Sequence, residues 1–147
     1  MAAAPILICY DGSVGAKHAI EAAAGLLDGH SAVVLAVGPP LTAEESYASL
    51  GLMPPSFEEL NEEQALERAK EGAEFAQSAG FAAEARAEVA APTWEGVVHV
   101  ADEIDAAAIV IGSRGLTGVK EALSGSVSHA VAEHAGRPVL IVPPSRD

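Results

Sequence analysis

Four glycines fall within one short stretch of the chain, which reads Gly-Ser-Arg-Gly-Leu-Thr-Gly-Val-Lys-Glu-Ala-Leu-Ser-Gly-Ser-Val from Gly112 to Val127. Gly112 and Gly115 allow the backbone to adopt positive φ and to approach a ligand closely, because neither carries a Cβ. Gly125 and Ser126 open a predicted helix, whose first N–H groups point outward as unsatisfied donors. The segment can therefore enclose an anion such as a phosphate group from two sides.

Arg114 and Lys120 are the only cations in this segment. Either can reach a phosphate, Arg114 as a planar fork and Lys120 as a point charge, and both are equally compatible with solvated surface groups. The whole chain has 8 basic and 21 acidic residues and a formal net charge of -13. A bound phosphate must therefore be held mainly by backbone N–H groups, a helix N-terminus or a metal ion. The same charge argues against nucleic acid and anionic membrane surfaces as partners.

Short continuous apolar runs predict the elements that position this segment. Strands buried on both faces are expected at Ile6 to Tyr10, Ala32 to Val37, Ala106 to Ile111 and Val139 to Val142. A fifth run, Ala82 to Val89, alternates with charged residues, which predicts a half-exposed strand toward an edge of the sheet.

Helical periodicity fills the intervals between these runs. The predicted helices begin after Ser13, Ser56, Thr93 and Gly125. The first ends near Asp28-Gly29, the second at Gly80 and the fourth before Gly136, and the third has Ile104 on its inner face. Strict alternation of strands and helices predicts an α/β fold: an open, doubly wound, five-stranded parallel sheet with helices on both faces, similar to a Rossmann fold. Ligands of such sheets bind at the carboxyl ends of the strands.

The predicted ligand edge comprises three segments, Cys9 to Ser13, Val37 to Pro40 and the stretch from Gly112 onward. The irregular stretch Gly38 to Pro55 begins at the same edge and is interpreted as a connector rather than a lid. A length of 147 residues suits a single domain spanning 1–147. Cys9 is the only cysteine and the N-terminal segment has no basic, apolar leader, so we expect a cytoplasmic protein without an internal disulfide.

The spacing Gly-x2-Gly-x9-Gly-Ser lies between a predicted strand and a predicted helix, which makes it a specific motif. Together with Asp11-Gly12-Ser13 after the first strand and Pro138-Val139-Leu140-Ile141-Val142 near the end, it resembles the universal stress protein family in its ATP-binding branch. The likeness covers nearly the whole chain. It implies a fold similar to that of the adenine nucleotide alpha hydrolases.

The resemblance also implies roles for individual residues. Cys9 would line the adenine pocket, the backbone of Val37 would contact adenine, and Ile111 would pack on the base. Asp11 would contact the nucleoside, Gly112 would lie near the ribose, and the phosphates would be surrounded by Gly115, Gly125, Ser126 and Val127. Mg or Mn would bridge the phosphates of ATP, and a homodimer would form along Val139 to Val142. Cysteine at position 9 departs from many members, which have proline, glycine or alanine there.

Structural roles for the same residues stay open. Asp11 can simply cap the following turn, and Gly112 and Gly115 can be ordinary turn glycines. Cys9 has no basic neighbour in the sequence and is interpreted as a packing thiol rather than a nucleophile. The five histidines lack metal-ligand spacing, so no protein metal site is predicted.

The leading hypothesis is a nucleotide-binding regulatory or stress-response module that acts on an adenine nucleotide by binding it. The chain has no Gly-x4-Gly-Lys-Ser/Thr loop and no evident base for a water, so no catalytic residue is assigned. The alternatives are a slow ATPase or phosphotransfer enzyme, a sensor of AMP or cyclic AMP, and a dimeric scaffold.

Overall fold

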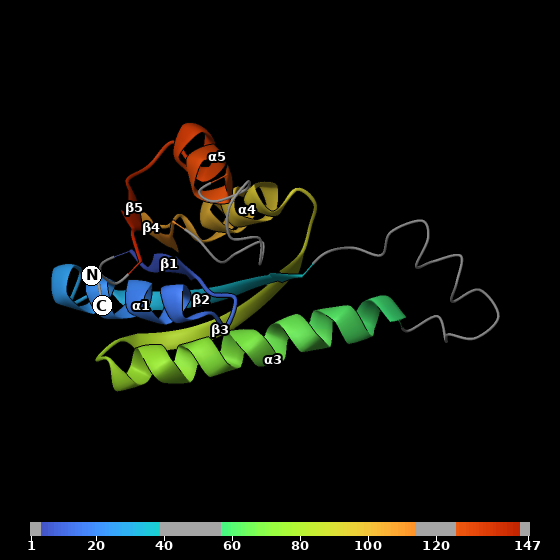
Figure 1. Cartoon of the computed structure of the whole chain (residues 1–147), viewed down its shortest axis with the longest axis horizontal. Helices are drawn as coiled ribbons and strands as arrows, with labels where there is room; N and C mark the ends of the chain where they lie inside the picture. The colour runs from blue at the N-terminus through green and yellow to red at the C-terminus, as the bar shows by residue number, and fades with distance from the viewer. Residues whose placement is uncertain (1–3, 39–56, 114–125, 145–147) are drawn as a thin grey trace.

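The computed structural model describes residues 4–38, 57–113 and 126–144. Within these ranges strands and helices alternate along the chain (Figure 1). The elements are β1 (Ile6–Cys9), α1 (Val14–Leu26), β2 (Ser31–Gly38), α3 (Phe57–Ser78), β3 (Ala82–Val89), α4 (Thr93–Ile104), β4 (Ala108–Gly112), α5 (Ser126–His134) and β5 (Val139–Val142).

All five strands run parallel in one sheet with the order β3-β2-β1-β4-β5. At its centre, Ile8 pairs with Val34 of β2 on one side and with Val110 of β4 on the other. The α/β fold class and the five-stranded parallel sheet are therefore confirmed. The half-exposed strand Ala82–Val89 lies at an edge, as its alternating charges predict.

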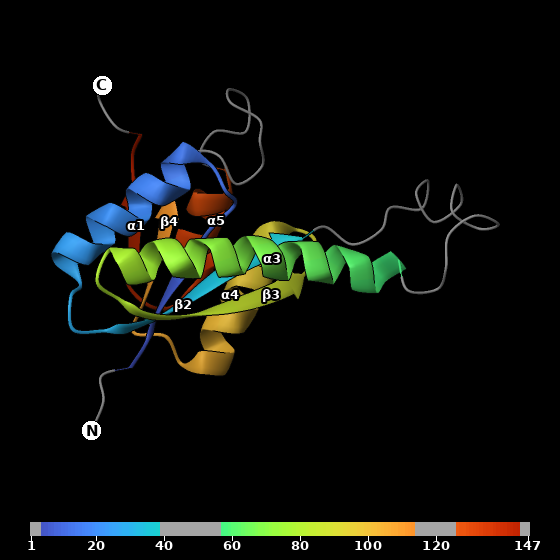
Figure 2. The same cartoon turned by 90° about the horizontal axis from the view of Figure 1, so that it is seen from below.

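Helices cover both faces of the sheet, α1 and α3 on one side and α4 and α5 on the other (Figures 1 and 2). Alternate residues of β1 point to opposite faces. Ile6, Ile8 and Tyr10 therefore join the core under α1 and α3, whereas Leu7 and Cys9 join the core under α4 and α5. All five of these side chains are buried. A charged side chain therefore has no exposed position on this strand before Asp11.

Small side chains bring α3 close to the sheet. Ala65, Ala69, Ala73 and Ala76 are buried along its inner face. Gly72 lies in the same stripe, and a Cβ there would be 2.7 Å from Cγ and Cδ2 of Tyr10. The Tyr10 ring therefore packs against the helix backbone itself. In the part of the chain that the structure describes, no helix is both long and apolar enough to cross a bilayer.

Two predicted boundaries need correction, and a third cannot be compared with the structure. Pro92, not Thr93, is the N-cap of α4, because the proline holds the extended conformation that a cap needs (φ −70°, ψ 160°) and Thr93 is already helical. The fourth strand begins at Ala108 rather than Ala106, because the Ala106 N–H bonds back to the carbonyl of Ala101 at the end of α4. The predicted cap at Ser56 lies outside the described residues.

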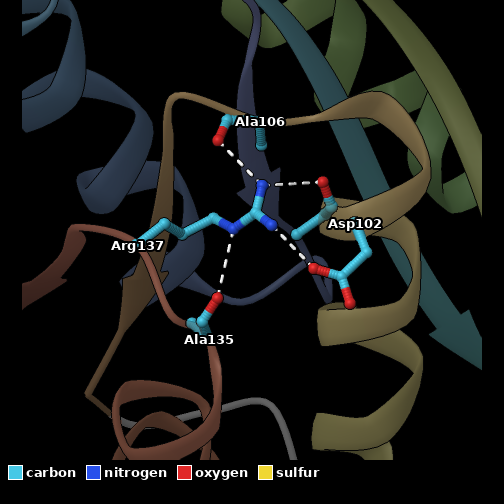
Figure 3. A network of polar contacts seen from close by, with 5 residues as sticks. Asp102, Ala106, Ala135 and Arg137 are labelled. Atoms are coloured by element: carbon cyan, nitrogen blue, oxygen red, sulfur yellow. Dashed lines mark hydrogen bonds and ion pairs between the residues drawn. The ribbon is translucent and has the colours of Figure 1, made fainter.

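Arg137 ties the end of α4 to the connection between α5 and β5 (Figure 3). Its Nη1 donates to the carbonyls of Ala101 and Ala106, each at 2.9 Å, and its Nε donates to the Ala135 carbonyl at 3.2 Å. Its Nη2 pairs with Asp102 Oδ1 at 2.6 Å, and the side chain is only 16% exposed. The guanidinium thereby links backbone carbonyls at the C-terminal ends of α4 and α5.

We expect Gly72→Ala to destabilise the fold, although alanine normally favours a helix over glycine by about 1 kcal/mol. The new methyl group would overlap Tyr10 and lie 2.8 Å from Val34 Cγ1, and overpacking of this kind costs about 1–3 kcal/mol. Urea denaturation measures the change. Gly25→Ala in α1 is the matched control, because a Cβ there meets nothing within 4 Å and should stabilise the helix. A Gly72→Ala protein as stable as the wild type would contradict this packing.

Candidate functional site

The strand ends that the sequence predicts to form a site do meet at one edge of the sheet. β1 ends at Cys9, and its neighbour β4 ends at Gly112, which pairs with Val142 of β5. The connection from β1 passes over one face of the sheet and the connection from β4 leads to α5 on the opposite face. The carboxyl ends of β1 and β4 therefore form a topological switch point, where open α/β sheets bind ligands.

Four predicted apolar contacts lie on the same face of the sheet. Cys9 and Ile111 belong to the core under α4 and α5, and Val37 and Val127 pack against that core while remaining partly exposed. The adenine residues Cys9, Val37 and Ile111 come from three adjacent strands in the order β2, β1, β4. The structure thus brings together an apolar floor suited to a planar, weakly polar ring.

The backbone of Val37 offers a donor and an acceptor at this edge. The β1–β2 ladder ends at the Cys9–Leu35 pair, and Leu35 uses its carbonyl to accept from the Tyr10 N–H at 2.9 Å. Residues two apart on a strand present their backbone groups to the same side, so those of Val37 also face β1, beyond its end. Gly38 faces the other way and accepts from Ala90 of the β3 side at 3.1 Å. Among the described residues, none pairs with Val37 on the β1 side.

Asp11 shapes the turn that ends β1. Its Oδ1 accepts from the Ser13 N–H at 2.9 Å, and Ser13 Oγ in turn accepts from the Ala16 N–H at 3.1 Å as the N-cap of α1. Gly12 between them has φ +85°, a conformation that favours glycine. The capping role of Asp11 is therefore present. A carboxylate has a second oxygen and accepts several hydrogen bonds, so this role leaves room for a ligand hydroxyl.

Cys9 is a buried, unreactive thiol in this arrangement. The residue is 2% exposed, and burial followed by the nearby Asp11 charge raises the pKa of Cys9 from 9.0 to about 12. A thiol that stays protonated at neutral pH is a poor nucleophile. The interpretation of Cys9 as a packing residue fits this environment.

Several predicted phosphate contacts fall on residues outside the described ranges, namely Arg114, Gly115, Lys120 and Gly125. Ser126 is the first residue of α5, so its N–H belongs to a helix N-terminus. Gly112, the predicted ribose neighbour, ends β4. The stretch 39–56, interpreted as a connector, also lies outside the described residues.

Gly96 is a residue near the site that the sequence analysis passed over. A Cβ at this position of α4 would lie 2.8 Å from Ala90 Cβ and 3.4 Å from Val37 Cγ1. The missing side chain lets α4 approach the end of β2 where Val37 offers its backbone. A glycine inside a predicted helix is the signal that could have revealed it.

The histidines take part in local contacts. His129 Nε2 lies 3.0 Å from Glu133 Oε1, and the His134 ring stacks on Trp94 with centroids 4.2 Å apart. His99 Nε2 contacts Glu103 Oε1 at 2.7 Å. Over the described ranges, no group of three or more His, Cys, Asp or Glu side chains is arranged to hold a metal ion.

Comparison with known proteins identifies the family. The model of the universal stress protein family matches residues 3–143 of the chain. This chain belongs to the universal stress protein family. It is 34% identical over 147 residues to the universal stress protein YxiE of Bacillus subtilis, a match that covers 93% of this chain and 97% of YxiE.

Two solved universal stress protein structures share the fold. One is a complex with cAMP, with a TM-score of 0.70 and 23% identity over 99% of this chain and 100% of the other. The second is an Archaeoglobus fulgidus protein in complex with dAMP, with a TM-score of 0.64 and 22% identity over 97% and 99% of the two chains. At these identities the comparison establishes the common fold.

The raised pKa of Cys9 predicts a loss of stability in alkali. The unfolded thiol ionises near 9.0 and the folded one near 12, so stability is fully present below the lower value and declines as the pH rises toward the higher one. The slope is at most about 1.4 kcal/mol per pH unit. Urea denaturation of Cys9→Ala between about pH 8 and 10 should show a shallower decline than the wild type. Equal slopes would contradict the buried, protonated thiol.

Proposed function

We propose that this chain binds an adenine nucleotide, with ATP as its main ligand, at the carboxyl edge of β1, β2 and β4. The backbone of Val37 carries the proposal, because it presents one donor and one acceptor beyond the end of β1. Adenine has a matching edge, with the N6 amino group as donor and a ring nitrogen as acceptor. Val37, which remains partly exposed against the buried Cys9 and Ile111, supplies the apolar surface on which the ring would pack.

The ribose and phosphates would continue from this base toward β4. Asp11 lies at the end of β1 with a carboxylate oxygen for a ribose hydroxyl, and the N-terminus of α5 at Ser126 has N–H groups suited to phosphate. The cAMP and dAMP complexes of proteins with this fold support an adenine nucleotide as ligand. The preference for ATP rests on the glycine spacing from Gly112 to Ser126.

Mg or Mn would accompany ATP as part of the ligand. The described residues offer no cluster of three carboxylates or histidines for a divalent ion. A magnesium ion bound to a nucleotide takes phosphate oxygens and water as ligands and needs few from the protein. In a chain of formal charge -13 the ion would reduce the charge of the triphosphate.

The biological role that suits this site is a regulatory, stress-response module. The one thiol at this edge, Cys9, is buried and stays protonated at neutral pH, so it offers no nucleophile to a bound nucleotide. Binding would change the conformation of the strand edge or the choice of partner. Turnover of ATP, if any, would be slow.

Purified protein should release nucleotide on denaturation or, once stripped, bind ATP with magnesium in a calorimeter. Gly115→Val combined with Gly125→Ala should abolish this binding, because the added side chains would occupy the space that the phosphates need. Circular dichroism checks that the variant folds. Absence of ATP, AMP and cAMP binding by the wild type would refute the proposal. Unchanged affinity in the variant would remove the glycine segment from the site.

We also propose a homodimer through β5. This strand is an edge of the sheet, and Ile141 is one of three large apolar side chains that are exposed in the described structure, at 38%. A second copy could cover Ile141 and pair with the open strand edge.

Light scattering at about 10 µM should therefore give a dimer, and Ile141→Lys should give a folded monomer, because a buried lysine would have to lose its hydration. Leu26→Lys is the matched control, since Leu26 is an exposed apolar residue on α1 and not part of the β5 edge, and its replacement should leave the dimer intact. A monomeric wild type would exclude this interface.

A further inference from the structure

Gly96 forms a tight contact between α4 and the ends of β2 and β3. The residue is buried near the start of α4. A Cβ at this position would lie 2.8 Å from the Ala90 Cβ, 3.4 Å from Val37 Cγ1 and 3.5 Å from Glu88 Cγ. Carbon atoms attract one another at about 3.5–4.0 Å, so only the first distance is far too short. The space between positions 90 and 96 therefore holds one methyl group, and Ala90 supplies it.

Ala90 cannot move aside without disturbing the end of β2. Its Cβ is attached directly to the backbone, so no change of rotamer would take it out of the gap. Its N–H donates to the carbonyl of Gly38 at 3.1 Å, and Gly38 directly follows Val37. A displacement of Ala90 would therefore be transmitted to the backbone beside Val37.

The helix α4 has little freedom to withdraw from this contact. Val97, Val100 and Ala101 are each at most 1% exposed and belong to the core between α4 and the sheet. Near the far end of the helix, Arg137 Nη1 donates to the Ala101 carbonyl at 2.9 Å. Relief of an added methyl group would therefore fall on the strand ends next to Gly96.

Val37 is the residue through which such a displacement would reach the candidate site. Its backbone groups on the β1 side are those assigned to adenine, and its partly exposed side chain is the surface assigned to the ring. One donor and one acceptor can serve the same edge of a base only while both keep their distance and angle. A small shift of Val37 would therefore weaken both kinds of contact.

We propose that Gly96 is a positioning residue for the base. It lets α4 and Ala90 hold Val37 where an adenine ring can use its backbone and its side chain together. This inference rests on the proposed function, because it explains how Val37 is placed for binding. Gly96 acts through Val37 and is assigned no contact with the ligand.

Gly96→Ala should weaken the binding of ATP and of adenosine by the same factor, about three- to tenfold, in calorimetry with magnesium. Equal factors are expected because the two ligands share the base and differ only in the phosphates. Gly25→Ala in α1 is the matched control. A Cβ at Gly25 meets nothing within 4 Å, so this variant should keep both affinities.

A second substitution separates positioning from a general loss of stability. Ala90→Gly combined with Gly96→Ala removes the opposing methyl group and leaves the new Cβ at 3.4 Å from Val37 Cγ1 and 3.5 Å from Glu88 Cγ. The double variant should therefore bind ATP and adenosine as the wild type does.

A measurement on the wild type does not depend on the folding of any variant. In amide NMR spectra, addition of ATP should shift the resonances of both Val37 and Gly96, because the two residues pack against each other. The resonance of Gly25 should stay in place.

Three results would overturn the positioning role and leave the proposed function intact. The first is unchanged affinity in a folded Gly96→Ala protein while the wild type binds normally. The second is a loss confined to ATP, or one that Ala90→Gly does not restore. The third is an ATP-induced shift of Val37 without one of Gly96. Failure of the wild type to bind ATP or adenosine, by contrast, would refute the proposed function itself.

Discussion

The backbone of β1 is enclosed on both faces, by α1 and α3 on one side and by α4 and α5 on the other. A strand in this position can carry only apolar side chains along its length, and Ile6 to Tyr10 are all buried. Charged side chains that could contact a ligand can therefore occur only after the end of the strand. Asp11 is the first residue past that limit, which is why the polar side chains of the candidate site gather at the carboxyl edge.

The unequal lengths of the strands turn this edge into a binding surface. β1 stops pairing with β2 at Leu35, whereas β2 continues against β3 as far as Gly38. The Asp11-Gly12-Ser13 turn causes the difference, because Gly12 at φ +85° directs the chain away from the sheet and into α1. The turn that caps α1 is thus the same feature that exposes the backbone of Val37, and Asp11 has a structural role that does not compete with a ligand role.

Sequence alone predicted the order of strands and helices along the chain and the edge at which the candidate site residues meet, because buried parallel strands appear as short apolar runs and their carboxyl ends share an edge. The family resemblance implied backbone contacts from Val37 to adenine, but the apolar pattern could not show that its backbone is unpaired on the β1 side, since pairing depends on where the neighbouring strand ends. Gly72 gave no sign of its contact with Tyr10 because periodicity reports which face is buried but not what lies opposite. Thr93 was wrongly chosen as a cap because its side chain suits that position, whereas Pro92 occupies it through its fixed φ.

Electrostatics decides how such an acidic chain can hold a nucleotide at all. The formal charge of -13 is spread over the molecule, and at physiological ionic strength charges beyond about 8 Å are largely screened. Groups next to the ligand therefore outweigh the net charge. Two of the described cations serve structure: Arg86 pairs with Glu103, whose pKa it lowers, and Arg137 holds the end of α4.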